Sequence, residues 1–542
     1  MATRPALLVI VVAGAALRLW QYSADTSLWI DEIALARSLL SMNLRSLLTS
    51  PLLHNQVAPP GFLLVQKLAV TALGPSDYAL RLFPLACSLA SLIAFGRLAA
   101  RTLEGAGAVL ALTLFATAAP LIAFGSLVKP YSTDVCVAVL MWRLAHGLAY
   151  GPVTPRRAAV AALLGSLLVW FSHSGVLMTA ALGAALASLS ALGRAKAVPR
   201  RALLTILGCW AFSSLAVTIA TLWNVTPDTR DYMQWFWGPL FPPPSLAGIV
   251  ATRWPLYQLR DLFGKGQAYT GLGYYMPLTY VALTAAGFVA LWRRDRRTAL
   301  LLTAPAALTL AAAAARQYPF ADRLIFFLLP GFMLAIAAAA EAARRLLWPF
   351  SRVAGTLAAA GLLFPAVYPL VTTPPAYYTE HMKPVMAYVR DRRRPGDAIY
   401  VYYGAAPAVT FYGPRYGLGR AEYLIGGCHR GDGRRYLREL DTLRGRPRVW
   451  VLLTHAGPRF REREDILAYL DAVGTRLDGI VVESHGVAAN LLPAEAHLYD
   501  LSGDRTSSAA AAEAFPLKGP SSPGARLGCG EGPQAMLETD FQ

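Results

Sequence analysis

The chain has 542 residues, of which 55% are hydrophobic and only 15% are charged. An ordinary soluble domain does not need so large an apolar fraction to fill its core, so the composition argues against the soluble classes and indicates a membrane protein. A formal net charge of +18 would point to nucleic acid in a soluble protein. Here many arginines lie in short gaps between apolar segments, and we expect no nucleic-acid partner.

Apolar segments, most of them about 18 to 24 residues long and able to cross a hydrocarbon layer of about 30 Å, recur through the first two thirds of the chain. The segments expected to span the membrane are 5–22, 79–99, 106–124, 132–149, 158–171, 174–192, 202–223, 273–292, 298–315, 324–341 and 352–372. The first segment is not followed by the small residues of a signal-peptide cleavage site, so it is interpreted as a signal anchor that is retained in the membrane. The predicted fold class is therefore a mainly α-helical polytopic membrane protein with about eleven transmembrane helices.

The arginines indicate an orientation. Every second gap between the predicted spans is basic: Arg97 with Arg101, Arg156 with Arg157, residues 194–201, residues 293–297, and Arg344 with Arg345. Basic gaps face the cytoplasm as a rule. An odd number of spans then predicts a multi-pass protein of the bacterial inner membrane with a cytoplasmic N-terminus and a periplasmic C-terminus.

Three outer segments are longer than simple connections: 23–78, 224–272 and the chain after about 375. In the first outer loop, 23–78, helices are expected at Asp31–Leu48 and Pro60–Leu73, along the membrane surface. In residues 376–502, helices expected at 382–393 and 462–473 alternate with short apolar strands expected at 397–403, 448–455, 478–484 and 497–501. This alternation predicts a small periplasmic α/β domain after a membrane domain of residues 1–375. Residues 503–542 are rich in Ala, Gly, Ser and Pro and are expected to be disordered.

The five cysteines show no spacing typical of a metal or redox motif. Three fall inside apolar segments, where a small hydrophobic residue is expected. Cys428 and Cys529 would both lie outside the membrane, where they could pair.

Acidic residues are informative in so apolar a chain, because a carboxylate near lipid is usually paired, solvated or used in chemistry. Most lie at predicted outer helix ends or in outer loops, together with Arg81, Lys129 and Arg323. A leaving phosphate needs cations to stabilise it, and an attacking hydroxyl needs a carboxylate base. The arrangement suits transfer from a lipid-linked phosphate. The alternative is that these residues form interfacial ion pairs that seat the helices.

The motifs SLWIDEIALARSLL, LLHNQVAPPGFLLVQKL and GPSDYALRLFPL follow one another in the first outer loop. In this order they resemble the GT-C glycosyltransferases, which include the protein O-mannosyltransferases and the aminoarabinose transferases, the glycosyltransferase family 39-like proteins. LVKPYSTDV resembles the basic-x-Tyr-x-x-Asp segment of that class, and QYPFADRLIFFLLP resembles one of its late outer turns. The resemblance covers roughly residues 1–370.

The resemblance implies that Asp31 is the catalytic base or positions the acceptor, with Glu32 beside it. It also gives Lys129, Tyr131 and Asp134 a place at the site. Asp134 is a candidate catalytic residue, and the candidate phosphate and donor contacts are Lys129, Tyr131, Arg81 and Arg323. The alternative for Asp31 and Glu32 is that they only favour the dipole of the helix they begin.

One family feature is absent. The aminoarabinose branch has a Glu-Lys pair directly before the Pro-Pro, where this chain has Val57 and Ala58. The phosphate-binding lysine is therefore missing, and His54 is the candidate substitute, with an ordinary surface histidine as the alternative. This difference leaves the sugar and the branch of the family open.

Four aromatic residues in the second outer loop have two interpretations. They are Tyr232, Trp235, Phe236 and Trp237. They could form part of an interfacial aromatic belt, or they could form one wall of a cavity that binds the donor or the acceptor.

The sequence thus predicts a glycosyltransferase of the cell envelope that moves a sugar from a polyprenyl-phosphate donor to a lipid, glycan or protein acceptor at the periplasmic face. Whether a divalent cation, Mg²⁺ or Mn²⁺, binds Asp31 or Glu32 is left open by their spacing. The alternative is a transporter or flippase of a lipid-linked sugar. Transporters tend to carry charges at the membrane midplane, whereas the charges here lie mainly at helix ends, which favours the enzyme.

Overall fold

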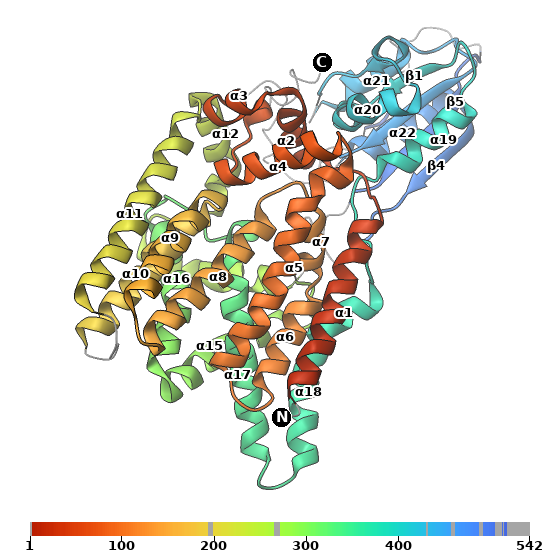
Figure 1. Cartoon of the computed structure of the whole chain (residues 1–542). Helices are drawn as coiled ribbons and strands as arrows, with labels where there is room; N and C mark the ends of the chain where they lie inside the picture. Colours follow the sequence, from red (N-terminus) through yellow and green to blue (C-terminus); the bar gives the residue numbers. More distant parts are fainter. Residues whose placement is uncertain are drawn as a thin grey trace.

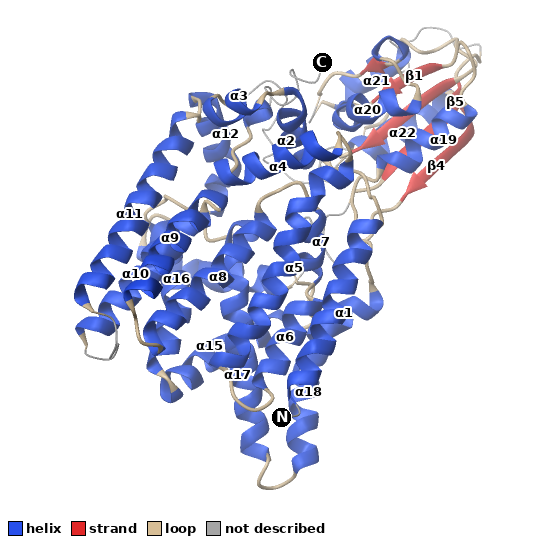
Figure 2. Ribbon diagram, viewed as in Figure 1, coloured by secondary structure: helices blue, strands red, loops and turns tan. Residues whose placement is uncertain are grey.

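A computed structural model describes residues 3–192, 199–264, 272–429, 432–456, 461–486, 492–503, 512 and 514–517. Long helices form a bundle, and a smaller domain that contains the sheet lies at one end of it, beside the short helices of the first outer loop (Figures 1 and 2). The N-terminus lies toward the opposite end of the bundle. Most of the predicted disordered tail and Cys529 lie outside the described residues.

All eleven predicted spans are helical. The helices of the bundle are α1 (Thr3–Ser23), α5 (Asp77–Thr102), α6 (Gly107–Thr117), α7 (Ala119–Ala123), α8 (Tyr131–Tyr150), α9 (Pro155–Leu168), α10 (Ser174–Ala191), α11 (Arg200–Trp223), α15 (Pro277–Arg294), α16 (Arg296–Ala314), α17 (Leu329–Leu347) and α18 (Arg352–Thr372). Within the described residues, seven helices are long and apolar enough to cross a membrane, or eight if one bent pair counts as a span. The protein is a mainly helical polytopic membrane protein.

The bent pair corrects one predicted span. Residues 106–124 were expected to form one helix, but α6 ends at Thr117 and the following helical segment turns away by 59°. Ala118 has an extended backbone there, and Pro120 opens α7. A proline disfavours the helical conformation in the residue before it, and proline itself fits well in the first turn of a new helix.

The first outer loop folds into short helices. Its described helices are α2 (Ile30–Ser41), α3 (Leu44–Thr49) and α4 (Pro60–Leu73). The single helix expected at Asp31–Leu48 is divided, because the side chain of Asn43 caps α3 by accepting a hydrogen bond from the Ser46 backbone N–H. α4 has the predicted bounds, with a proline in its first turn and Gly74 after its end at φ +86°.

The second outer loop is also helical over its described residues. It contains α12 (Pro227–Trp237), α13 (Leu246–Thr252) and α14 (Trp254–Phe263). The side chain of Thr226 caps α12 by accepting from the Thr229 backbone N–H. Thr229 in turn donates to the side chain of Asn55, which ties α12 to the first outer loop.

The C-terminal domain contains a mixed five-stranded sheet in the order β2-β1-β3-β5-β4. Its elements are α19 (Met382–Arg392), β1 (Ala398–Val401), α20 (Ala406–Tyr412), β2 (Leu424–Ile425), α21 (Gly433–Asp441), β3 (Val449–Thr454), α22 (Glu462–Val473), β4 (Thr475–Val482) and β5 (Ala494–Asp500). β1 pairs in parallel with β2 and β3, and β5 pairs antiparallel with β3 and β4. The sequence analysis did not predict α20, α21 or β2.

One hydrophobic core joins the C-terminal domain to the first outer loop. It contains Leu28, Ile33 and Phe62 of the loop together with Val385 of α19 and Trp450 of β3. A separate apolar cluster lies under α21 and α22 on another part of the sheet. Because burial of shared apolar surface is the main favourable contribution to packing, the domain and the loop stabilise each other.

Candidate functional site

An ion pair between the first outer loop and a late outer turn forms the centre of the site. Asp31 lies in the first turn of α2, and its Oδ2 is 3.1 Å from a guanidinium nitrogen of Arg323 in the 3₁₀ helix η5 (Asp322–Leu328). The side chain of Asp31 is 24% exposed and that of Arg323 is 10% exposed. Arg323 is thus paired with a carboxylate of the first outer loop. Asp31 therefore faces both a cation and open space.

Lys129 is the second cation of the site. It lies between α7 and α8 and donates a hydrogen bond of 2.6 Å from its Nζ to Oε1 of Gln56. Burial raises the pKa of Asp31, but the charges of Lys129, Arg323 and His455 outweigh that effect and hold the pKa below its ordinary value. Asp31 is therefore ionised at neutral pH.

Burial has the dominant effect on Lys129 itself. It lowers the pKa of the ammonium group below the ordinary value for lysine, although the charge of Asp31 opposes the shift. A partly desolvated ammonium group gains more from an anionic ligand than a solvated one does.

Aromatic rings surround the Arg323 guanidinium. Its central carbon lies 5.9 Å from the ring centre of Trp29, 5.7 Å from that of Tyr131, 6.0 Å from that of Phe236 and 5.4 Å from that of Trp237. Such contacts attract a cation to the ring face and restrict its orientation. For the aromatic residues of the second outer loop, this placement favours the cavity wall over the membrane belt. We call Asp31, Lys129, Tyr131 and Arg323 the Asp31 site.

Glu32 and Arg81 pair with each other and with the backbone. Glu32 Oε1 accepts from the Val128 backbone N–H at 2.8 Å and lies 3.6 Å from Arg81, and both side chains are almost fully buried. Arg81 also donates to the backbone carbonyls of Thr26 and Ser27. Burial raises the pKa of Glu32, while Arg81 and the backbone donors oppose that shift. These two predicted site residues hold the loop in place.

Asp134 and His54 occupy other places. Asp134 accepts a hydrogen bond of 2.6 Å from the hydroxyl of Ser172, just before α10. His54 is buried in a tight turn and has a left-handed backbone with φ +55°. The structure therefore gathers four of the eight predicted residues in the Asp31 site, and Asp134 and His54 remain predictions without a placement in it.

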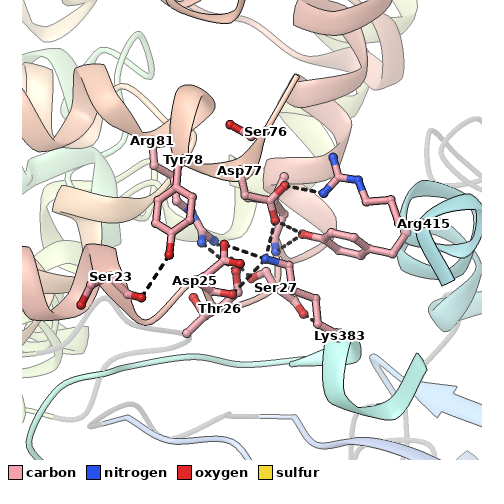
Figure 3. Close-up of polar contacts among 12 residues, drawn as sticks. Ser23, Asp25, Thr26, Ser27, Ser76, Asp77, Tyr78, Arg81, Lys383 and Arg415 are labelled. Atoms are coloured by element: carbon pink, nitrogen blue, oxygen red, sulfur yellow. Dashed lines mark hydrogen bonds and ion pairs between the residues drawn. The ribbon is translucent and has the colours of Figure 1, made fainter. Parts of the chain in front are cut away.

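A second polar cluster attaches the C-terminal domain to the loop (Figure 3). Oδ1 of Asp77 lies 3.0 Å from Arg415, and Oδ2 lies 2.8 Å from Lys383 and 2.7 Å from the hydroxyl of Tyr412. Lys383 also pairs with Asp25 at 2.8 Å. We call Asp77, Lys383, Tyr412 and Arg415 the Asp77 network. No motif indicated it, because three of its members follow Asp77 by more than 300 residues.

The Asp77 network contacts the backbone segment that precedes Asp31. The hydroxyl of Tyr412 accepts a hydrogen bond of 2.8 Å from the Leu28 backbone N–H. The hydroxyl of Ser27 accepts from the Lys383 backbone N–H at 2.8 Å, and Nδ1 of His381 lies 2.9 Å from the same oxygen. The C-terminal domain thus contacts the residues immediately before α2.

A divalent cation at Asp31 or Glu32 stays a prediction from the sequence. Within the described residues, no three His, Cys, Asp or Glu side chains converge on a point where a metal ion could bind. The described partners of Asp31 are cationic, and Glu32 accepts from backbone N–H groups. No step below uses a metal ion.

Cys428 is disulfide-bonded. Cys87 and Cys136 are buried free thiols within the bundle, as expected of small apolar residues. Cys209, also free, is exposed on α11.

No protein-family model matches the chain, and no curated protein matches it significantly. Among solved structures, the chain is similar to ArnT from Cupriavidus metallidurans bound to undecaprenyl phosphate, with 14% identity and a TM-score of 0.48 over 92% of this chain and 99% of that one. It is also similar to the archaeal oligosaccharyltransferase AglB from Archaeoglobus fulgidus in complex with an inhibitory peptide and a dolichol-phosphate, with 12% identity and a TM-score of 0.43 over 82% and 69%. Both are GT-C glycosyltransferases, the class that the motifs of the first outer loop resemble.

Proposed function

We propose that the protein is a glycosyltransferase that transfers a sugar from a polyprenyl-phosphate donor to an acceptor at the periplasmic face of the bacterial inner membrane. The observation that carries the proposal is the Asp31 site, where one partly exposed carboxylate lies beside two cations at the surface end of a membrane helix bundle. Ordinary interfacial ion pairs do not need a surrounding aromatic cage or a second, desolvated cation.

Arg323 and Lys129 would hold the donor phosphate. A guanidinium can bind two phosphate oxygens at once, and its aromatic neighbours already fix its plane. As the bond between the anomeric carbon and the phosphate oxygen breaks, negative charge grows on that oxygen. Cations fixed beforehand stabilise this charge without reorganising.

Asp31 would contact the acceptor. The attacking hydroxyl must lie against the anomeric carbon, on the side opposite the leaving phosphate, and an ionised carboxylate can accept its hydrogen bond there. The pKa of Asp31, held below its ordinary value by Lys129, Arg323 and His455, keeps the carboxylate in this accepting form at neutral pH.

A small hollow lies next to the partner of Lys129. Its lining includes Leu47, Leu63 and Ala220 together with Gln56, whose side chain accepts the hydrogen bond of Lys129. The basic gaps at the other end of the bundle support the periplasmic placement.

The test uses purified full-length protein with undecaprenyl phosphate linked to mannose, glucose or aminoarabinose. Each donor is offered with lipid A, a glucan oligosaccharide or a Ser/Thr-rich peptide, and released undecaprenyl phosphate is measured. We expect one combination to be turned over and Asp31→Asn to lose at least about 100-fold. Asp228→Asn, on the exposed first turn of α12, is the matched control. Failure of every combination with wild type, or normal turnover by Asp31→Asn, would refute the proposal.

A further inference from the structure

A fully buried arginine in α1 has no carboxylate partner in the part of the chain that the structure describes. Arg18 lies near the end of α1 that leads to the first outer loop, and it is 0% exposed. A charge without a counter-ion inside a membrane helix bundle is costly and usually has a specific role. The transfer proposed above does not use Arg18, and its hydrogen-bond partners indicate what else it does.

The guanidinium of Arg18 binds the end of α6, where the chain bends away. It donates hydrogen bonds of 3.2 Å to the backbone carbonyls of Phe115 and Ala116, and its central carbon lies 5.8 Å from the ring centre of Phe115. In an unbroken helix the Ala116 carbonyl would accept from the N–H of residue 120, but Pro120 has none. Arg18 supplies donors that the bend removes, and its positive charge suits the negative end of α6.

Arg18 also contacts the segment after the bend, through Ser88 of α5. Nε of Arg18 donates to Oγ of Ser88 at 2.9 Å, and that hydroxyl donates to the Leu121 carbonyl of α7 at 3.3 Å. Gly125 belongs to the 3₁₀ helix η2 (Phe124–Ser126) and lies so close that a Cβ there would be 2.9 Å from Oγ of Ser88. The same arginine and serine therefore hold the chain on both sides of the bend.

The segment held in this way leads directly to the Asp31 site. The rings of Phe124 and Tyr131 lie 5.2 Å apart, and both residues line one small cavity together with Ser88. Lys129 comes three residues after the end of η2, and the residue before it donates its backbone N–H to Glu32. The position of the Lys129 ammonium group thus depends on where the bend places η2.

We propose that Arg18 is a positioning residue for the transfer: it fixes the bend after α6 and thereby holds Lys129 where it can bind the donor phosphate. This rests on the function proposed above. Because Arg18 is fully buried, it contacts neither donor nor acceptor itself. Its loss should weaken donor binding and leave the acceptor KM unchanged. A merely structural role would instead lower the number of active molecules without changing the affinity of those that remain.

The experiment measures the affinity of the purified full-length protein for undecaprenyl phosphate in a double-mutant cycle. We expect Arg18→Leu and Lys129→Gln each to weaken binding at least about tenfold. The double variant should bind no more weakly than Lys129→Gln, because two residues that act through one contact do not give additive losses.

Gly125→Ala tests the same assignment from the other side of the contact. Its methyl group would push η2 away from Ser88 while Arg18 remains, so it should also weaken binding of undecaprenyl phosphate. This variant is decisive if Arg18→Leu does not fold. Arg143→Leu is the matched control, because Arg143 also lies in the bundle and donates to a backbone carbonyl, that of Ala94 at 3.3 Å. It should bind like wild type.

Three results would overturn the assignment while wild type binds undecaprenyl phosphate. They are wild-type affinity in Arg18→Leu, additive losses in the double variant, and an equal loss in Arg143→Leu. Wild-type affinity in Lys129→Gln, or a wild type that does not bind undecaprenyl phosphate, would instead overturn the donor contact proposed above, and this assignment with it.

Discussion

The Asp31 site and the Asp77 network are both clusters of carboxylates and cations at the same end of the bundle, but they differ in how fully their carboxylates are paired and buried. Asp77 is 2% exposed, and its two oxygens have three partners within 3.0 Å. Asp31 is 24% exposed and lies 3.1 Å from Arg323. A buried carboxylate with full pairing holds structure together. A partly exposed carboxylate beside cations can still bind a ligand.

This comparison predicts that variants of the two clusters fail in different ways. Changes in the Asp31 site should reduce turnover with little effect on thermal stability. Changes in the Asp77 network should reduce stability. They should reduce turnover only to the extent that the C-terminal domain changes its position.

The largest effect is expected for Arg323→Gln. Loss of one charge that stabilises the leaving phosphate should reduce turnover by about 100-fold to 1,000-fold, while the thermal unfolding midpoint stays near that of wild type. Arg316→Gln, on the same outer turn but exposed over the ring of Phe241, is the control and should be normal. Equal turnover in the two variants would contradict a phosphate contact at Arg323.

Asp77→Ala should mainly destabilise the protein. It removes the common partner of Lys383, Arg415 and Tyr412, and breaking a buried ion pair costs about 3–5 kcal/mol. Thermal unfolding in detergent measures the loss, and the affinity for undecaprenyl phosphate should not change. Asp391→Ala, which removes an exposed ion pair with Arg390, should leave the unfolding midpoint unchanged. A stable Asp77→Ala protein would show that the network does not hold the domain.

Lys129 should make donor binding sensitive to alkaline pH. An ammonium group binds phosphate only while it is protonated, and burial lowers the pKa of Lys129 below that of ordinary lysine. Affinity for undecaprenyl phosphate should therefore fall as pH rises, at a lower pH than for ordinary lysine. Because arginine remains charged, Lys129→Arg should remove this alkaline loss. Identical profiles of binding between about pH 7 and pH 10 in the two proteins would exclude Lys129 as the titrating group.

The smallest effect is expected for the aromatic cage. Trp237→Leu removes one ring beside Arg323, and a cation–π contact contributes about 0.5–2 kcal/mol. Donor affinity should fall by less than about 30-fold, since about 1.4 kcal/mol equals tenfold. Trp235→Leu on the same helix is the control, because Trp235 packs on Tyr232 and Phe236. A larger loss for Trp235→Leu would place the donor elsewhere on α12.

Much of the fold could be predicted from the sequence because its signals are local. Apolar length gave the helices of the bundle, and Pro60 with Gly74 gave the bounds of α4. The helix at Glu462–Val473 also has the predicted bounds. The division at Asn43 and the bend at Ala118 were missed, because a cap or a proline changes the chain direction without changing its hydropathy.

The candidate site was predictable only in part. Asp31, Lys129, Tyr131 and Arg323 lie together in the structure, but their grouping came from a resemblance in motif order and not from their spacing. Glu32 directly follows Asp31, but its described hydrogen bonds and ion pair are with Arg81 and with the backbone N–H groups of Trp29 and Val128. The Asp77 network could not be found, because Lys383, Tyr412 and Arg415 follow Asp77 by more than 300 residues and no motif links them to it.

The hydrogen bond from the Val128 backbone N–H to Glu32 also determines a distance within the Asp31 site. Asp31 and Glu32 are consecutive, so the first turn of α2 carries both the proposed acceptor contact and the carboxylate that holds the segment containing Lys129. This dipeptide therefore sets the distance between Asp31, the proposed acceptor contact, and Lys129, the proposed phosphate contact. Under the proposed function, lengthening the segment between α7 and α8 by one residue should change that distance and, with it, the size of the first sugar that the donor can carry.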